Sequence, residues 1–565
     1  MKFLGSQFSY FIRDPQARRN LGALKTYLFF LLGIIVLYSV LFHVVMLWEG
    51  QDHSWLTGFY WTLTVMSTLG FGDITFDSDI GRLFSVLVMS SGVVLLLIML
   101  PFAFIRFFYA PWLEAQIRAK VPTKVAPELE NHVIICQRDF ITNGLVRKLK
   151  LNDIPYCILE GDHQKAAQLR EEGLTVVAGQ IDDTQTFENV NVNKARLLLA
   201  NAADAVNTNI LLTVRSISST IPIIALAEED DSIDIFSMSG ATYPLALKTR
   251  LGEHLATRIG SGTGTAQEVG RFKDLVIVEF LVHGTPLEGK SLLKAGIRES
   301  TGMNVVGLWD SGRLCSVDPN KPLGETCVPV AVGRQEQVDR LNKLLGSGDA
   351  GQHEVLVIGG GKVGRSTATA LRKRGVIVRI VDQNPALEKE LAPFCDKVII
   401  GNAADRKVLE AAGVGTANAV ALTTHDDAQN IHLAVYFRRL KPELGIVSRI
   451  TRERNIDAIY RAGADFVLSY ASLGCEFITA YLLKREPVMV GEGADFFSVD
   501  VPASLANKTL AESGIGSETG LVVIAFEYGG QTTTNPPPTV VLQSKGKLLL
   551  LGTNAQRERF NAVFG

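Results

Sequence analysis

Residues 68–73 read Thr-Leu-Gly-Phe-Gly-Asp, and their types and spacing suit the binding of a dehydrated cation. The glycines at alternate positions, Gly70 and Gly72, allow backbone conformations that other residues rarely adopt. Such a backbone can turn successive carbonyl oxygens toward one axis, where they replace the water around a cation. Thr68 adds a hydroxyl at the inner end of the stretch, and Asp73 adds a carboxylate at its outer mouth. An ordinary loop that contains Gly-Phe-Gly is the alternative interpretation.

Two long apolar segments flank this stretch, at residues 24–48 and 83–108. Each is long enough to cross a membrane, because the hydrocarbon core needs about 20 helical residues. Residues 55–66 are too few to cross and predict a re-entrant helix, which is tolerated only inside protein or against water. Basic residues lie on both outer flanks, so we expect a multi-pass protein of the inner (plasma) membrane with both termini in the cytoplasm. These residues are Arg13, Arg18, Arg19 and Lys25 before the first segment, and Arg106, Arg118 and Lys120 at or after the end of the second.

The composition of the chain excludes some classes of partner. A formal net charge of −2 over 565 residues argues against nucleic acid as a partner. The six cysteines all follow the second apolar segment and form no C-x-x-C pair, so we expect buried thiols in a reducing compartment. From Val121 onward, short β-branched runs alternate with amphipathic stretches, which predicts α/β sheets with crossover helices.

This α/β region repeats itself. Glu160 and Asp382 each close a β-branched run, and they belong to a series of matching positions that are 221 to 223 residues apart. Each repeat therefore predicts a doubly wound domain followed by a smaller one with short strands. The predicted boundaries are 1–23 for an N-terminal segment, 24–110 for a transmembrane pore domain, 111–128 for a linker, 129–260 and 261–345 for the two parts of the first repeat, 346–352 for a Gly/Ser-rich seam, and 353–485 and 486–565 for the second repeat.

The second repeat carries a nucleotide-binding fingerprint. A buried-type strand at residues 355–358 leads into G-x-G-x-x-G, formed by Gly359, Gly361 and Gly364, and then into a helix-like run. The first glycine permits a tight turn, the second lets a phosphate approach the backbone, and the third lets the helix pack on the strand. The N-terminus of that helix faces the phosphates. A Rossmann turn with a purely structural role is the alternative.

The residues around the fingerprint suggest which nucleotide binds. Asp382 ends the next strand, where its carboxylate can accept hydrogen bonds from a ribose and disfavours a 2′-phosphate. We therefore expect NAD or an ADP-like adenine nucleotide rather than NADP, with Lys362 adding positive charge near the phosphates. The first repeat has no glycine between its strand and Gly144, so we expect no dinucleotide there. The fingerprint thus predicts Gly359, Gly361, Lys362, Gly364 and Asp382 as binding residues.

The chain resembles the RCK (KTN) potassium channels, the calcium-gated archaeal and multi-ligand-gated bacterial kind. The resemblance rests on residues 68–73, on the tandem α/β repeats, and on residues 359–364 with Asp382 and Gly401-Asn402-Ala403. The usual filter of potassium channels reads Thr-Val-Gly-Tyr-Gly-Asp, so this chain departs from it at two positions, Leu69 and Phe71. Phe71 lacks the hydroxyl that would brace the filter. Asn402 replaces the acid of the family's Gly-Asp-Ala, which lies beside the bound nucleotide. The resemblance therefore implies that Val363, Asn402 and Ala403 also belong to the binding site.

The resemblance implies a two-span α-helical pore with a re-entrant helix, followed by tandem Rossmann-like RCK domains that each carry a small α+β C-terminal subdomain. It also implies a homotetramer around one potassium-selective pore, with eight RCK domains in a cytoplasmic ring that senses ligands. The selectivity filter would comprise Thr68, Leu69, Gly70, Phe71, Gly72 and Asp73, with K⁺ bound at the first four.

The second apolar segment predicts a gate. Gly92 can let an inner helix bend, and the apolar run that follows it can form a constriction that closes by losing water. Leu97 lies about one and a half turns below Gly92, and we predict that it forms the narrowest ring. The alternative is that Leu97 faces lipid or a neighbouring helix.

Other interpretations stay open from the sequence. Acidic residues follow the strand-like run 221–227, and carboxylates suit a regulatory Ca²⁺, although acids that open a helix commonly complement its dipole. An NAD-dependent oxidoreductase anchored in the membrane would need a catalytic cluster, which neither repeat shows, although His425 and Asp426 lie at the rim of the site. A potassium transport or antiport component regulated by RCK domains is the remaining alternative. The acidic residues are Glu228, Glu229, Asp230, Asp231 and Asp234.

Overall fold

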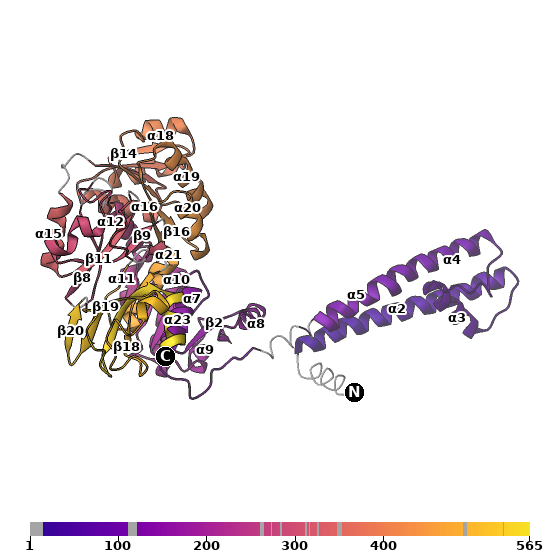
Figure 1. Cartoon of the computed structure of the whole chain (residues 1–565). Helices are drawn as coiled ribbons and strands as arrows, with labels where there is room; N and C mark the ends of the chain where they lie inside the picture. Colours follow the sequence, from indigo (N-terminus) through magenta and orange to yellow (C-terminus); the bar gives the residue numbers. More distant parts are fainter. Residues whose placement is uncertain are drawn as a thin grey trace. The chain divides into compact units, whose positions relative to one another are not determined.

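The computed structural model divides into two compact units, residues 1–123 with 161–178 and residues 124–160 with 179–565. We describe the helical part and the α/β part of the chain each by itself (Figure 1). Parts of the predicted N-terminal segment, linker and seam (residues 1–14, 111–112, 114–120 and 347–352) lie outside the described residues. The structure describes residues 15–110, 113, 121–259, 265–272, 274–282, 285–310, 313–315, 317–324, 327–346, 353–489, 494–534 and 536–565.

The helical part contains two helices that are long and apolar enough to cross a membrane. They cover Gly22–Trp48 and Asp79–Phe104, with mean hydropathies of 2.6 and 2.7. The short helix α3 packs against both α2 and α4 (Figure 1). The helices are α2 (Pro15–Trp48), α3 (Trp55–Met66), α4 (Asp79–Gly92), the π-helix η1 (Val93–Met99), α5 (Leu100–Phe104) and the π-helix η2 (Ile105–Tyr109).

An aromatic cluster holds the short helix in place. Trp61 of α3 is buried, and its ring centroid lies 5.0 Å from that of Phe42 on α2 and 5.2 Å from that of Phe76. Aromatic pairs at such separations add to the stability that burial alone provides. Because Phe76 lies just after residues 68–73, the same cluster fixes both ends of that stretch.

The first repeat begins with a parallel sheet. Its strand order is β3-β2-β1-β4-β5-β6, the order of a doubly wound dinucleotide-binding fold. The strands are β1 (Val133–Ile135), β2 (Tyr156–Glu160), β3 (Val176–Ala178), β4 (Leu197–Ala200), β5 (Ile223–Leu226) and β6 (Tyr243–Leu245). The helices are α7 (Thr142–Leu151), α8 (His163–Glu171), α9 (Thr184–Asn189), η3 (Val192–Lys194), α10 (Asp204–Ile217), α11 (Ser232–Met238) and α12 (Leu247–Ile259).

A smaller antiparallel sheet with the order β10-β9-β11-β8-β7 completes the first repeat. Its strands are β7 (Gln267–Phe272), β8 (Leu275–Glu279), β9 (Asn304–Asp310), β10 (Arg313–Cys315) and β11 (Val328–Gly333). Helices α13 (Leu292–Ala295), α14 (Ile297–Thr301) and α15 (Gln335–Leu345) accompany it.

The second repeat has the same parallel topology, β14-β13-β12-β15-β16-β17. Its strands are β12 (Glu354–Ile358), β13 (Ile377–Asp382), β14 (Lys397–Ile400), β15 (Ala419–Leu422), β16 (Gly445–Ile450) and β17 (Phe466–Ser469). The helices are α16 (Lys362–Arg372), η5 (Pro385–Leu387), α17 (Glu388–Leu391), η6 (Ala392–Phe394), α18 (Arg406–Ala412), α19 (Asp427–Leu440), η7 (Glu453–Asn455), α20 (Ile456–Arg461) and α21 (Tyr470–Leu482).

A four-stranded antiparallel sheet, β18-β21-β19-β20, ends the chain. It contains β18 (Ala494–Asp500), β19 (Val522–Tyr528), β20 (Gln531–Thr534) and β21 (Lys547–Thr553), with helices α22 (Ile515–Thr519) and α23 (Asn554–Phe564). The predicted fold class is therefore confirmed: apolar helices with a short helix between them precede two doubly wound sheets, and each of these is followed by a small α+β part.

The two repeats pack closely against each other. Helix α12 of the first lies along α16 of the second. The close approach requires Gly252, because a Cβ there would lie 2.6 Å from the carbonyl oxygen of Val363. The helix that follows the glycine fingerprint is therefore also a contact surface between the repeats.

Candidate functional site

The backbone of the predicted filter adopts left-handed conformations at alternate positions. The φ angles are +62° at Thr68, +39° at Gly70 and +74° at Gly72. Glycine tolerates such angles at no steric cost, whereas Thr68 is strained, which the sequence did not indicate. Strain of this kind at a non-glycine residue is typical of functional sites.

Hydrogen bonds to the short helix shape this stretch. The N–H groups of Leu69 and Gly70 both donate to the carbonyl oxygen of Thr64, at 2.9 Å and 3.2 Å. Among the residues that the structure describes, none donates a hydrogen bond to the carbonyl oxygens of residues 68–72. Bonded N–H groups and free carbonyl oxygens are the arrangement that a cation-coordinating backbone needs.

The outer end of the stretch has a brace that sequence reasoning missed. The Tyr60 hydroxyl of α3 donates to the Asp73 carboxylate at 3.0 Å, and the Tyr60 ring stacks on Phe71 with centroids 6.5 Å apart. Helix α3 therefore braces this end through the Tyr60 hydroxyl on Asp73 and the Tyr60 ring on Phe71. A tyrosine 13 residues before Asp73 carries no local signal for this pairing.

The predicted gate residues lie at an irregular part of the second long helix. Gly92 ends α4, and a Cβ there would lie 2.4 Å from the Cα and carbonyl oxygen of Met66, so this glycine allows α4 to pack on the end of α3. Leu97 lies in the π-helix η1, with 46% of its surface exposed in the single chain. Departures from α-helical bonding of this kind accompany bends in helices.

The glycine loop of the second repeat leaves a helix N-terminus open. Gly359 has a φ of +100°, and a Cβ on Gly364 would lie 1.9 Å from the Gly359 carbonyl oxygen. In contrast, a Cβ on Gly361 would meet no heavy atom within 4 Å. Within the described residues, no side chain caps α16 at Gly361. The first N–H groups of α16 are therefore available to an anion such as a phosphate.

Asp382 connects the ribose position to this loop. Its Oδ2 atom accepts a hydrogen bond from the Gly360 N–H at 2.6 Å, and its Oδ1 atom accepts one from Asn384 at 2.8 Å. The side chain is half-buried at the carboxyl end of β13, next to the strand β12 that precedes the loop. Asp382 thus holds the glycine loop while keeping lone pairs for a ligand hydroxyl.

The remaining predicted binding residues differ in what they can offer. Asn402 is exposed and accepts a hydrogen bond from the Ala404 N–H at 2.9 Å. The side chains of Val363 and Ala403 are buried in the protein core, so only their backbones can face a ligand. Lys362 lies at the first position of α16, where its ammonium group is ion-paired across the repeat boundary with Glu229 and Asp230.

The corresponding helix of the first repeat carries its own anion. Asp139 Oδ1 accepts hydrogen bonds from the N–H groups of Ile141 and Thr142, both at 3.0 Å, and from the Thr142 hydroxyl at 2.8 Å. This carboxylate satisfies two of the N–H groups at the start of α7 and places a negative charge where a phosphate would otherwise bind. The two repeats therefore share a fold but present opposite surfaces to an anion.

The acidic residues that follow β5 do not gather into a metal-binding group. No cluster of three or more His, Cys, Asp or Glu side chains with metal-binding geometry occurs among the described residues. At the rim of the nucleotide site, Asp426 caps α19 through the Ala428 N–H at 2.9 Å. His425 lines a cavity of about 800 Å³ between the carboxyl edges of the two parallel sheets.

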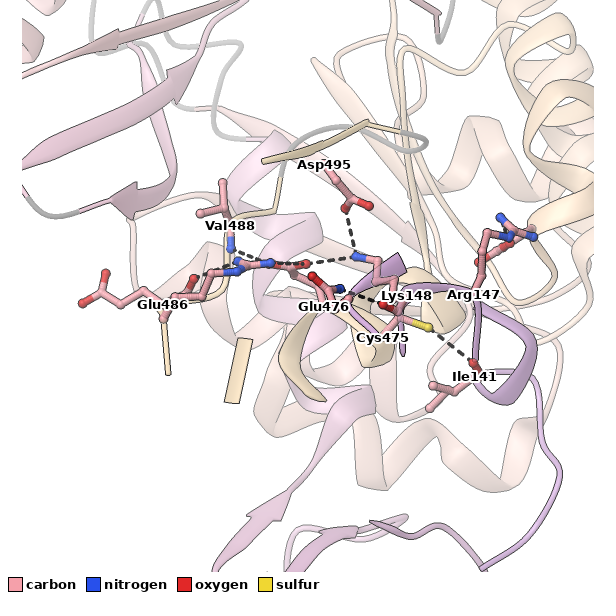
Figure 2. Close-up of polar contacts among 11 residues, drawn as sticks. Ile141, Arg147, Lys148, Cys475, Glu476, Glu486, Val488 and Asp495 are labelled. Carbon is pink, nitrogen blue, oxygen red and sulfur yellow. Dashed lines mark hydrogen bonds and ion pairs between the residues drawn. The ribbon is translucent and has the colours of Figure 1, made fainter. Parts of the chain in front are cut away.

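An ionic cluster joins the first repeat to both parts of the second (Figure 2). Lys148 of α7 lies 3.1 Å from Glu476 of α21 and 2.9 Å from Asp495 of β18. Although burial opposes the charged form, the carboxylates of Asp495 and Glu476 raise the pKa of Lys148 above its usual value. Arg485 holds the same Glu476 at 2.5 Å. Neighbouring Cys475 is buried, and its thiol contacts the Ile141 carbonyl oxygen at 3.3 Å.

Three protein families match parts of the chain. The Ion channel family matches residues 27–109, the TrkA-N domain matches residues 133–245 and 355–470, and the TrkA-C domain matches residues 496–565.

Solved structures and curated relatives extend this result. The chain is 34% identical to the structure described as the GsuK channel bound to NAD, which covers 97% of this chain and 99% of its own, with a TM-score of 0.56. The GsuK RCK domain structure is 30% identical over 80% of this chain and 99% of its own, with a TM-score of 0.55. Potassium channel protein 1 of Methanocaldococcus jannaschii is 24% identical over 57% of this chain and 99% of its own length.

Proposed function

The chain belongs to the family of potassium channels with RCK domains that includes the GsuK channel, and from this membership we propose that NAD or an ADP-like adenine nucleotide binds the second repeat and controls the pore. Membership in a family of potassium channels makes the chain a membrane channel, and so neither an enzyme nor an antiporter. The oxidoreductase and antiport alternatives are therefore set aside.

One observation carries the nucleotide assignment: the first turn of α16 is uncapped, with open space at Gly361 and the Asp382 carboxylate beside the loop. This arrangement supplies N–H donors for phosphates and an acceptor for ribose hydroxyls. The carboxylate disfavours a 2′-phosphate, which supports NAD over NADP. The similar GsuK structure contains NAD, which supports the same choice.

The pore assignment rests on the backbone of the filter. Four copies of residues 68–73 would surround one axis in a homotetramer and offer K⁺ the free carbonyl oxygens of Thr68, Leu69, Gly70 and Phe71. Gly72 and Asp73 complete the outer mouth. Below it, Leu97 would form a hydrophobic constriction in the closed state, and the helix irregularity after Gly92 would let it widen.

A ligand can control the pore only if its affinity differs between the closed and open states of the RCK ring. We place both termini in the cytoplasm of a cell whose inner (plasma) membrane holds the pore, with eight RCK domains in one ring. Nucleotide shifts the equilibrium between closed and open rings only by the difference in its affinity for the two. The linker at 111–128 would carry the resulting movement. Regulation by Ca²⁺ has no ligand set among the described residues, so we do not extend the proposal to it.

The proposal is tested on the full-length channel in planar bilayers. We expect K⁺ current with little Na⁺ current, a change in open probability on addition of NAD or ADP, and loss of that change in Asp382→Ala and in Gly361→Asp. Glu160→Ala is the matched control, because Glu160 occupies the same position in the first repeat. Nucleotide sensitivity that survives both Asp382→Ala and Gly361→Asp would refute the assignment.

A further inference from the structure

The lysine of the glycine loop already has anionic partners from the other repeat. Lys362 Nζ lies 2.7 Å from a Glu229 oxygen and 3.5 Å from an Asp230 oxygen. These acids belong to residues 228–231, which we term the acidic turn and which follows β5 of the first repeat. The Lys362 side chain is 20% exposed, so these carboxylates replace much of the water around its ammonium group.

The first repeat fixes the acidic turn independently of Lys362. The N–H groups of Glu228 and Glu229 donate to the Asp204 carboxylate at 2.7 Å and 3.0 Å. Asp230 accepts a hydrogen bond from the Thr249 hydroxyl of α12 at 2.6 Å. The backbone of the turn and the Asp230 carboxylate are therefore held in place without Lys362.

The acidic turn and the glycine loop line one space. A cavity of about 1150 Å³ is bordered by Glu229 and Asp230 on one side and by Gly360, Gly361 and Lys362 on the other. A phosphate at the open N-terminus of α16 would enter the same electrostatic environment as the two carboxylates. The Lys362 ammonium group cannot keep close contacts with both the carboxylate oxygens and the phosphate oxygens, because each new contact displaces an existing one.

We propose that the acidic turn is an intramolecular competitor for the nucleotide phosphates: on binding, Lys362 exchanges Glu229 and Asp230 for a phosphate oxygen. The exchange releases a contact between the repeats at the helix α16, which packs on α12. The inference rests on the proposed nucleotide function and names how that site is regulated. It also gives the acidic residues a role that requires no metal.

The first test measures NAD affinity by titration calorimetry of the detergent-purified full-length channel. Neutralising the competitor with Glu229→Gln and Asp230→Asn frees Lys362, and exposed ion pairs of this kind predict about two- to fivefold tighter binding. Asp234→Asn is the matched control, since Asp234 lies in the same acidic segment without an ion pair to Lys362 among the described residues. The control is expected to bind NAD as the parent does.

A second test asks whether the effect passes through Lys362. In a Lys362→Met background, neutralising Glu229 and Asp230 is expected to change NAD affinity by less than about twofold, because no lysine remains to be released. A gain that persists undiminished in this background would mean that the acids act by direct repulsion, and it would overturn the proposed exchange.

Binding of NAD with unchanged affinity in the Glu229→Gln, Asp230→Asn variant would overturn this inference and leave the nucleotide site standing. Failure of the parent channel to bind NAD would overturn both.

Discussion

Replacing either of two glycines in one loop with alanine should have different effects: one change should weaken nucleotide binding and the other should destabilise the fold. Gly361 has a φ of −69°, which alanine adopts freely, and its Cβ would point into open space. The Cβ of Gly364 would lie 1.9 Å from the Gly359 carbonyl oxygen and 2.8 Å from the Thr423 hydroxyl. Gly361→Ala therefore tests the ligand space, and Gly364→Ala tests the fold around it.

The magnitudes follow from these contacts. Gly361→Ala costs the fold about 0.5–1 kcal/mol, since alanine is a poorer N-cap than glycine. It keeps a phosphate from the N–H groups of α16, and loss of one charge-assisted hydrogen bond worth about 1.5–3 kcal/mol weakens NAD binding roughly 10- to 100-fold. Gly364→Ala forces α16 away from β12 and costs the fold about 1–3 kcal/mol.

Calorimetry with NAD and the thermal unfolding midpoint of the full-length channel separate the two effects. We expect Gly361→Ala to melt close to the parent but to bind NAD weakly, and Gly364→Ala to melt at a lower temperature. If Gly361→Ala bound NAD as tightly as the parent, phosphates would not approach the loop there and the reasoning would be refuted.

Three further substitutions probe other parts of the molecule. Leu97→Asp should hydrate the constriction and hold the channel open without ligand; an unchanged low open probability in single-channel recordings would contradict this. Tyr60→Phe removes the bond to Asp73 and should lower the equilibrium constant for the conducting form of the filter about fivefold. The expected sign is a shift in reversal potential that indicates weaker selectivity for K⁺ over Na⁺. Lys148→Met leaves Asp495 without its ion-pair partner and should lower the stability of the α/β part by about 3 kcal/mol in chemical unfolding, whereas an unaltered midpoint would show that the cluster adds no net stability.

Sequence patterns predicted the architecture because local signals specify it. Buried β-branched runs, glycines at fixed spacing and two apolar segments each reflect a requirement within one element or between neighbours in the chain. The doubly wound sheets and the apolar helices accordingly appear as expected. The burial of Val363 and Ala403 was not foreseen, because a motif does not indicate which of its side chains face the core.

Contacts between distant segments could not be predicted in this way. Lys362 and Glu229 are 133 residues apart and Lys148 and Glu476 are 328 residues apart, so no periodicity relates them. The role of Asp139 is an intermediate case. Its position two residues before Ile141 and three before Thr142 is a recognisable capping pattern, but the same pattern starts many helices that never face a ligand.

The position of Asp139 has a consequence for how many nucleotides each polypeptide can bind. Since the chain itself supplies a negative charge at the start of α7, we expect the first repeat of each subunit to bind no nucleotide. Only the second repeat would then respond to NAD or an adenine nucleotide. Titration should then reach its plateau at one nucleotide per polypeptide, and a value near two would mean that Asp139 can be displaced.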